Sequence, residues 1–83
     1  MSTTTEVLSA VRAERDRQRH LYATGKHSID CSMSYFGNLA KLPILVEEVG
    51  EVAIAINDNE STEALKAELI QVAAVAVALA ESL

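Results

Sequence analysis

The sequence predicts an all-α protein with three helices per chain, and two observations indicate this. Three segments carry helical patterns bounded by capping or turn residues. No segment keeps the alternation of a β-strand beyond four residues, except Val75–Ala78, where both residue types are apolar.

The first helix is expected to open at Thr3-x-x-Glu6, which has the spacing of a capping box, and to run to about Tyr22 without glycine or proline. Residues 23–37 are rich in serine, glycine and other polar residues and have no clear period. We expect them to form a polar connection.

The second helix is expected from about Leu39 to Asn57, with Pro43 tolerable only if it lies in the first turn. Residues 58–61 offer N-cap candidates in a turn, and 62–82 form the third predicted helix.

The chain is expected to form a single domain over residues 1–83. A chain of 83 residues builds only a marginal core by itself, yet 49% of these residues are hydrophobic and only 4% are aromatic. The alanine-rich end of the third helix permits close helix approach. We therefore predict a homo-oligomer, in which helices of several chains share a core resembling a four-helix bundle.

Several classes of protein are disfavoured. Cys31 is the only cysteine, so neither a disulfide framework nor a cysteine zinc site is expected. Nothing at the N-terminus resembles a signal peptide, and the uncharged run Leu69–Ala80 is far shorter than the roughly 20 residues that span a bilayer. We expect a soluble, cytoplasmic protein without a membrane partner.

The charge is uneven. Residues 1–27 have a balance of +2 and residues 28–83 a balance of −7, within a net charge of −5. A surface that binds nucleic acid would need the opposite emphasis, so no nucleic-acid partner is expected. Acidic helices beside a short basic segment fit a divalent cation held near a phosphorylated small molecule.

The acids of the second helix form a narrow stripe of one sign. Glu47, Glu48 and Glu51 fall within an arc of roughly 100° on a helix that is otherwise apolar. In the third helix, Glu68 and Gln71 lie one turn apart on the inward side, whereas Glu63, Lys66 and Glu81 share an outer side. We expect the four glutamates to face inward around Mg²⁺ or Mn²⁺. The alternative is a solvated helix edge.

The inward side of the first helix becomes polar along its length. Its members are Val7, Leu8, Val11, Glu14, Arg15, Gln18 and Tyr22. Arg15 could bind a phosphate, or form a buried salt bridge with a glutamate of the second helix. Tyr22 and Phe36 could stack on a base, whereas Cys31, His20 and His27 are expected to carry no chemistry.

These residues resemble a known signature. The run 47–51 (EEVGE), followed by 68–71 (ELIQ), resembles the EExxE…ExxD signature of the MazG-like family of all-α NTP pyrophosphatases. The run 14–18 (ERDRQ) is similar to the ERxRQ element of a compact subgroup, and the resemblance covers most of residues 12–82.

The resemblance implies hydrolysis of a nucleoside triphosphate to the monophosphate and pyrophosphate, with Mg²⁺ as cofactor, by a house-cleaning enzyme that forms dimers or tetramers. By position, Glu48, Glu51 and Glu68 match metal ligands, and Glu47 matches an acid that orients or deprotonates water. Gln71 stands where the signature has aspartate, and an amide is a weaker ligand.

Candidate substrate-binding residues are Glu14, Arg15, Gln18, Tyr22 and Lys26; Arg15, Lys26 or Arg19 could meet the phosphate charge. The Trp-Gly pair that usually follows the basic element is missing here, so the preferred base is left open. The alternatives are a non-catalytic helical interaction module and another member of the superfamily, such as a dUTPase-like enzyme or a phosphoribosyl-ATP pyrophosphohydrolase.

Overall fold

The computed structural model describes residues 2–27, 29–33 and 37–83. It contains three helices: α1 (Thr4–Ala23), α2 (Asn38–Asn57) and α3 (Thr62–Glu81). None of the described residues forms a strand. The prediction of an all-α fold with three helices is confirmed.

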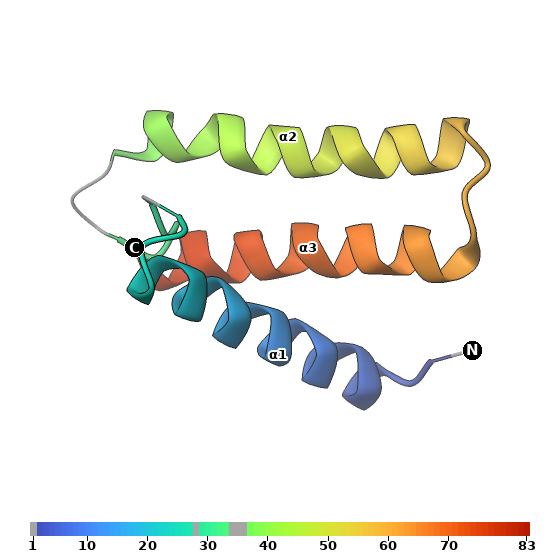
Figure 1. The fold of residues 1–83 in the computed structure, drawn as a ribbon, viewed down its shortest axis with the longest axis horizontal. Helices are drawn as coiled ribbons and strands as arrows, with labels where there is room; N and C mark the ends of the chain where they lie inside the picture. Colours follow the sequence, from blue (N-terminus) through green and yellow to red (C-terminus); the bar gives the residue numbers. More distant parts are fainter. Residues whose placement is uncertain (1, 28, 34–36) are drawn as a thin grey trace.

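Helix α3 lies between the other two helices (Figure 1). Helix α2 packs antiparallel along one side of α3, and α1 crosses the other side, running in the same general direction as α3. In the described part of the chain, α1 and α2 each pack against α3 but not against each other. Whatever joins α1 to α2 must therefore come from long side chains or from the connection between them.

The ends of α1 are fixed by local hydrogen bonds. The predicted capping box is present: the Thr3 hydroxyl accepts from the Glu6 backbone N–H, and Glu6 accepts from the Thr3 backbone N–H. At the other end Gly25 has a φ of 77°, and the Lys26 N–H reaches back to the carbonyl of Leu21. This Schellman arrangement turns the chain out of the helix, and glycine adopts it without strain.

The turn between α2 and α3 has the same arrangement, with asparagine in place of glycine. Asn59 has a φ of 53°, and the Glu60 N–H donates to the carbonyl of Ala55. Ser61 then caps α3 by accepting from the Ala64 N–H at 3.1 Å. The predicted turn with an N-cap residue is confirmed.

Pro43 lies deeper in α2 than expected. The helix begins at Asn38, so Pro43 falls in the second turn, and the prediction that it occupies the first turn is wrong. Proline has no N–H to donate to the carbonyl of Leu39. Leu39 is 86% exposed at the end of the helix, where water can satisfy that carbonyl.

The buried core is small and consists mainly of small side chains. Val75 and Ala78 of α3 pack with Cys31 of the connection, and Ile44 and Leu45 of α2 border this cluster. Ala55 and Ala74 are also buried. Alanines at these contacts let the helices approach closely, and little apolar volume remains inside. Phe36, a candidate for base stacking or the core, lies outside the described residues.

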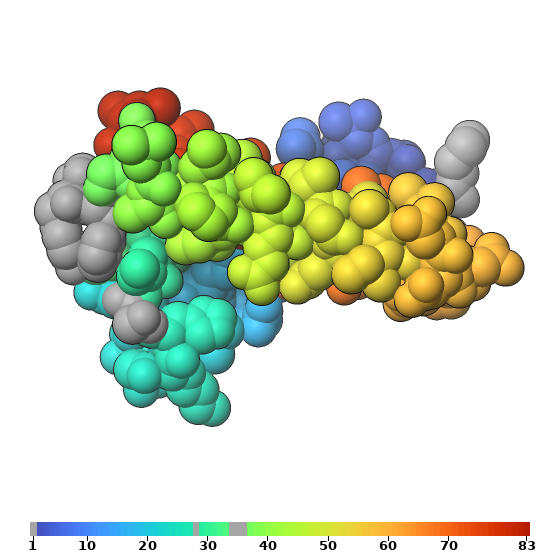
Figure 2. Space-filling view, turned by 90° about the horizontal axis from the view of Figure 1, so that it is seen from above, coloured from blue at the N-terminus to red at the C-terminus, as the bar shows by residue number. Residues whose placement is uncertain are grey.

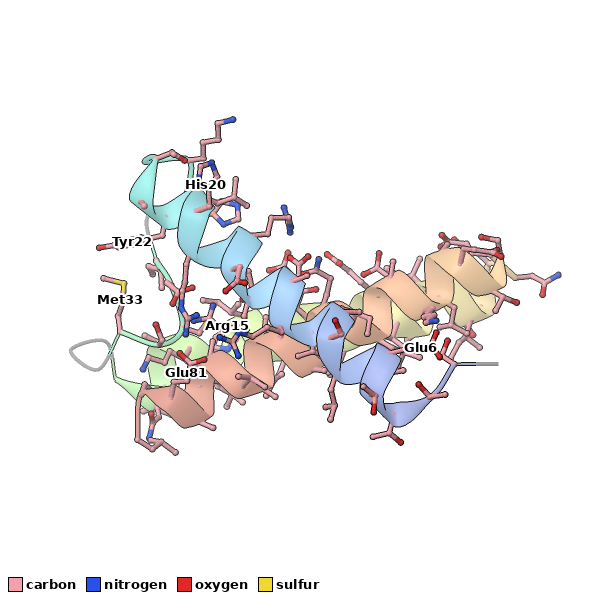
Figure 3. All side chains as sticks on the ribbon, turned by 90° about the horizontal axis from the view of Figure 1, so that it is seen from below. Glu6, Arg15, His20, Tyr22, Met33 and Glu81 are labelled. Atoms are coloured by element: carbon pink, nitrogen blue, oxygen red, sulfur yellow. The ribbon has the colours of Figure 1, made fainter. Side chains whose placement is uncertain are left out.

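The two largest fully buried side chains are charged, Arg15 and Lys41. The Arg15 guanidinium donates to both carboxylate oxygens of Asp30 (2.9 and 3.1 Å) and to both of Glu81 (3.3 Å each). It also donates to the Gln18 amide oxygen at 3.0 Å. Figure 3 shows Arg15 of α1 directed toward Glu81 near the end of α3.

This network corrects two predictions. Arg15 forms a buried salt bridge, but its partners lie in the connection and in α3, not in α2. Glu81 was expected on an outer face with Glu63, yet it binds both Arg15 and Arg19. These two arginines lower the pKa of Glu81 despite its partial desolvation.

Other apolar residues are more exposed than the pattern suggested. Leu8 and Tyr22, both predicted on the inward side of α1, are 62% and 39% exposed. Tyr22 points away from the helices (Figure 3). Among the described residues, no helix has the length and apolar character needed to cross a membrane.

We expect Arg15→Met to lower the free energy of unfolding by about 3 kcal/mol, because Asp30 would remain buried without a cation. Urea unfolding at a fixed protein concentration measures the change. Arg12→Met is the matched control, since Arg12 is an exposed arginine of the same helix with no ion pair among the described residues. Equal stability of the two variants would contradict a structural role for Arg15.

Candidate functional site

Helices α2 and α3 bring three carboxylates together. Glu48, Glu51 and Glu68 each offer an oxygen, and these oxygens lie within 4.8 Å of one another. Two of the residues are one helical turn apart on α2, and the antiparallel packing of α3 places the third opposite them. All three side chains are partly buried. The predicted inward position of these three glutamates is confirmed.

Two oxygens of this cluster lack a hydrogen-bond partner. Oε2 of Glu48 and Oε2 of Glu68 are both buried and accept no hydrogen bond from any residue that the structure describes. A buried carboxylate oxygen without a donor or cation is costly, and most buried polar atoms in folded proteins are paired. The arrangement is therefore electrostatically incomplete in the chain by itself.

The pKa values of the cluster move in the direction this crowding requires. Burial raises the pKa of Glu48, and the neighbouring charges of Glu51 and Glu68 raise it further. The pKa of Glu68 is raised mainly by a hydrogen bond shared with Glu51, and also by burial. In both residues the negative charge of Glu51 adds to these causes, so the charged forms also repel one another. A proton or a metal cation would relieve that repulsion.

Glu47 does not join this cluster. Its side chain is exposed, so the prediction that it faces inward is wrong. The residue lies one position before Glu48, and this single step of about 100° turns it out of the α2–α3 interface. It still borders the cluster, because its charge contributes to the raised pKa of Glu48.

Helix α1 adds a second charged pair beside the cluster. Arg17 Nε donates to both carboxylate oxygens of Glu14, at 2.8 and 2.9 Å. Burial raises the pKa of Glu14, but Arg17 and the Gln71 amide outweigh burial and hold that pKa below its usual value. The charge of Glu14 in turn raises the pKa of Glu48. Glu14, Gln71 and Glu48 are therefore neighbours, on three different helices.

A cavity of about 160 Å³ opens beside Glu48 and Gln71. It is bounded by α1, by the connection and by the inner sides of α2 and α3. Its lining residues are Arg17, Gln18, His27, Ile29, Asp30, Cys31, Ile44, Glu48, Gln71 and Val75. It combines apolar walls with two amides, a cationic group and a carboxylate of the cluster, a combination typical of small-molecule sites.

The predicted substrate-binding residues divide into two groups. Gln18 lines the cavity and Glu14 lies beside it through Arg17 and Gln71. Arg15 is 1% exposed and fully engaged by Asp30 and Glu81, so its geometry favours the structural role over phosphate binding. Tyr22 and Lys26 are exposed and do not line the cavity.

Four lining residues with polar or titratable side chains were missed by the sequence interpretation: Arg17, His27, Asp30 and Cys31. Arg17 could have been found from its i,i+3 spacing to Glu14, which predicts an ion pair directed along the inward side of α1. His27, Asp30 and Cys31 lie in the irregular connection, where no periodicity indicates which side chains point inward. Burial raises the pKa of Cys31. The thiol is therefore held in its neutral form at neutral pH.

The donor set of the cluster suits a hard divalent cation. Carboxylate oxygens are the ligands that Mg²⁺ and Mn²⁺ prefer, and three of them with two unpartnered oxygens meet the need for charge neutralisation. Gln71 could add an amide oxygen, which is neutral. Comparisons of the chain with protein-family models, curated proteins and solved structures found no significant match.

We expect Glu48→Gln to stabilise the metal-free protein at pH 7. The folded state raises the pKa of Glu48, so this group's contribution to stability is present at low pH and is lost as pH rises through that value. The variant should melt a few degrees higher at pH 7, since about 1 kcal/mol corresponds to roughly 4–8 °C in a domain of this size. The difference should vanish near pH 4.

The same thermal melts with and without Mg²⁺ complete this test. Mg²⁺ should raise the melting temperature of the wild type and have little effect on Glu48→Gln. Glu63→Gln, on the exposed side of α3, is the matched control and should respond to Mg²⁺ as the wild type does. A wild type indifferent to millimolar Mg²⁺ would contradict the proposed fit.

Proposed function

We propose that the protein is a Mg²⁺-dependent nucleoside triphosphate pyrophosphohydrolase, which converts a triphosphate and water into the monophosphate and pyrophosphate. The observation that carries this proposal is the cluster of Glu48, Glu51 and Glu68, with two buried, unpartnered oxygens, at the edge of a cavity. A chain that places three carboxylates in contact without a cation gains no stability from them. A ligand that neutralises them explains their presence.

The chemistry of phosphoanhydride cleavage matches this site. The reaction depends on positioning and charge neutralisation, and it needs no protein nucleophile. A divalent cation, when bound, neutralises phosphate oxygens and lowers the pKa of a coordinated water. Glu48, Glu51 and Glu68 would hold it, and Glu47, exposed and one residue from the cluster, is proposed to accept a proton from the attacking water.

The choice of substrate comes from the resemblance to MazG-like pyrophosphatases in the motif runs at 14–18, 47–51 and 68–71. On this basis we propose that the substrates are non-canonical or surplus (deoxy)nucleotides and that the protein acts in the cytoplasm. Gln71, in place of aspartate, leaves the site one negative charge poorer. The nearby carboxylate of Glu14 also faces Glu48, but its charge is neutralised by Arg17.

Substituting a proposed ligand should abolish hydrolysis. We expect Glu48→Gln and Glu68→Gln to reduce pyrophosphate release from a panel of (deoxy)nucleoside triphosphates by more than about 100-fold, since even outer-shell partners of a metal cost about 10–100-fold. Glu47→Gln should lower the rate with little change in Mg²⁺ dependence. Glu63→Gln should leave activity unchanged.

The alternative function is a non-catalytic helical interaction module in which the acids bind metal structurally or are simply solvated. The same assay distinguishes the two. Pyrophosphate release that is absent with every triphosphate tested, while Mg²⁺ still raises the melting temperature, would favour the module. Activity that survives both ligand substitutions would rule out the proposed metal site.

We further propose that the protein self-associates through α2. This helix carries an exposed apolar stripe with alternating spacings of three and four residues: Leu39, Leu42, Val46, Val49, Ala53 and Ile56. The large residues of the stripe are between 50% and 86% exposed. A seam with this heptad spacing is the pattern by which helices pack against each other in bundles. Figure 2 looks onto the outer side of α2, which no other described segment covers.

Helix α3 extends this apolar surface. Leu69, Ala76 and Ala80 are exposed on its outer side, opposite Gln71. Because Glu48 and Gln71 mark the side of the α2–α3 hairpin that faces α1, the stripe of α2 and the outer row of α3 lie on the other side. Two such hairpins placed face to face would form a four-helix bundle, as a dimer or as the core of a tetramer.

A charge in the middle of the stripe should dissociate the oligomer. We expect Val49→Glu to reduce the mass measured by analytical ultracentrifugation at micromolar concentration to that of one chain. Ile54→Glu is the matched control, because Ile54 is an apolar residue of α2 that lies off the stripe. Its side chain is 55% exposed, close to the 51% of Val49. A wild type that sediments as a monomer would overturn the proposal.

A further inference from the structure

The cavity beside the carboxylates has a cationic rim. Arg17 lines the cavity together with Glu48, and the negative charges of Glu14 and Glu48 both raise the pKa of its guanidinium. Arg17 therefore lies beside both the carboxylate cluster and the cavity. A cation in this position is close to any anion that reaches the cluster through a bound metal.

The Arg17–Glu14 pair is not an ordinary surface salt bridge. The Glu14 side chain is 12% exposed, whereas the Arg17 side chain is 53% exposed. The carboxylate is thus anchored in the protein, and it holds the Nε edge of the guanidinium in a fixed orientation. Among the described residues, Nη1 of Arg17 has no hydrogen-bond partner. Because Nη2 also donates to Glu14, at 2.5 Å, the N–H groups left for a ligand are those of Nη1 and the second one of Nη2. This end of the positioned guanidinium suits bidentate binding of phosphate.

The other basic candidates, Arg15, Arg19 and Lys26, do not line the cavity. The Arg15 guanidinium is consumed by Asp30 and Glu81, and Arg19 is bound to Glu81. Lys26 is exposed and does not line the cavity. Of the arginines and lysines in the described part of the chain, Arg17 is the one that faces both the cavity and the carboxylate cluster.

The size of the cavity indicates how a ligand would divide between its interior and its rim. A cavity of about 150 Å³ holds one benzene ring, so a volume of about 160 Å³ admits a single six-membered ring and little more. Ile44 and Val75 provide apolar walls for such a ring, and the Gln18 amide can hydrogen-bond its edge. The phosphates of a nucleotide would stay at the rim, beside Arg17 and Glu48.

We propose that this cavity is the substrate pocket and that Arg17, positioned by Glu14, binds the part of the triphosphate chain that leaves as pyrophosphate. The inference rests on the proposed hydrolysis, since that reaction requires a phosphate chain at the carboxylate cluster. It adds a residue that was not among the predicted substrate-binding residues, and it makes Glu14 a positioning residue for Arg17.

Binding of inorganic pyrophosphate tests this without requiring turnover. We would titrate pyrophosphate with excess Mg²⁺ into the full-length protein by isothermal titration calorimetry. Arg17→Gln should weaken binding at least about tenfold, and Arg17→Lys, which keeps the charge but loses the fork, should fall between it and the wild type. Arg12→Gln is the matched control, an exposed arginine of the same helix, and should bind within about twofold of the wild type.

In the hydrolysis assay Arg17→Gln should raise KM more than it lowers kcat. Glu14→Gln should also raise KM, without removing a cation. Arg17→Gln that binds pyrophosphate as tightly as Arg12→Gln would overturn the role of Arg17, and so would a wild type that does not bind pyrophosphate at millimolar concentration.

The failure of this inference is distinguishable from failure of the proposed function. If triphosphate hydrolysis needs Glu48 but is unchanged in Arg17→Gln, the proposed hydrolase function stands and the proposed role of Arg17 is wrong. If pyrophosphate binding needs Arg17 but the protein hydrolyses none of the nucleotides, the phosphate site stands and the proposed hydrolase function is wrong.

Discussion

The buried guanidinium of Arg15 determines how the three parts of this chain are arranged. Because α1 and α2 do not pack against each other, α1 is placed only by its contacts with α3 and the connection. Arg15 binds Glu81 at the end of α3 and Asp30 in the connection, and it is 1% exposed. Asp30 is adjacent to Cys31, which packs on Val75 and lines the cavity. One side chain therefore orients α1 on α3 and holds Asp30, which lines the candidate pocket.

Helix α2 reverses the usual distribution of polar and apolar residues. A helix at the surface of a soluble domain normally buries its apolar side and exposes its charges. Here Glu48 and Glu51 face α3, while Val46 and Val49 are more than half exposed. Both departures are costly in an isolated chain, since one crowds like charges and the other leaves apolar surface in water. A cation bound at the glutamates would remove the first cost, and a second chain packed on the apolar stripe would remove the second. The proposed metal site and the proposed self-association therefore support each other.

The sequence was most informative where local chemistry decides the outcome. Thr3 with Glu6, and Ser61, indicated helix starts correctly because capping depends on neighbours three residues away. The inward direction of Glu48 and Glu68 followed from helical geometry. The partners of Arg15 did not follow, because Asp30 lies in an irregular connection and reaches Arg15 only through the tertiary fold. The burial of Lys41 has no local signal either, since it stands among apolar residues that are themselves exposed.

The position of the carboxylates within the α2–α3 contact links the chemistry to stability. The apolar cluster around Val75 and Ala78 lies toward the connection, and Ala55 is buried toward the opposite turn. Glu48, Glu51 and Glu68 lie between these two patches, so their repulsion acts in the middle of the contact between α2 and α3. A cation there would convert this repulsion into a cross-link between the helices. Because binding stabilises the folded state by mass action, a variant of these three residues that loses ion affinity also loses the stabilisation by the ion, even where removing a charge makes its metal-free form more stable.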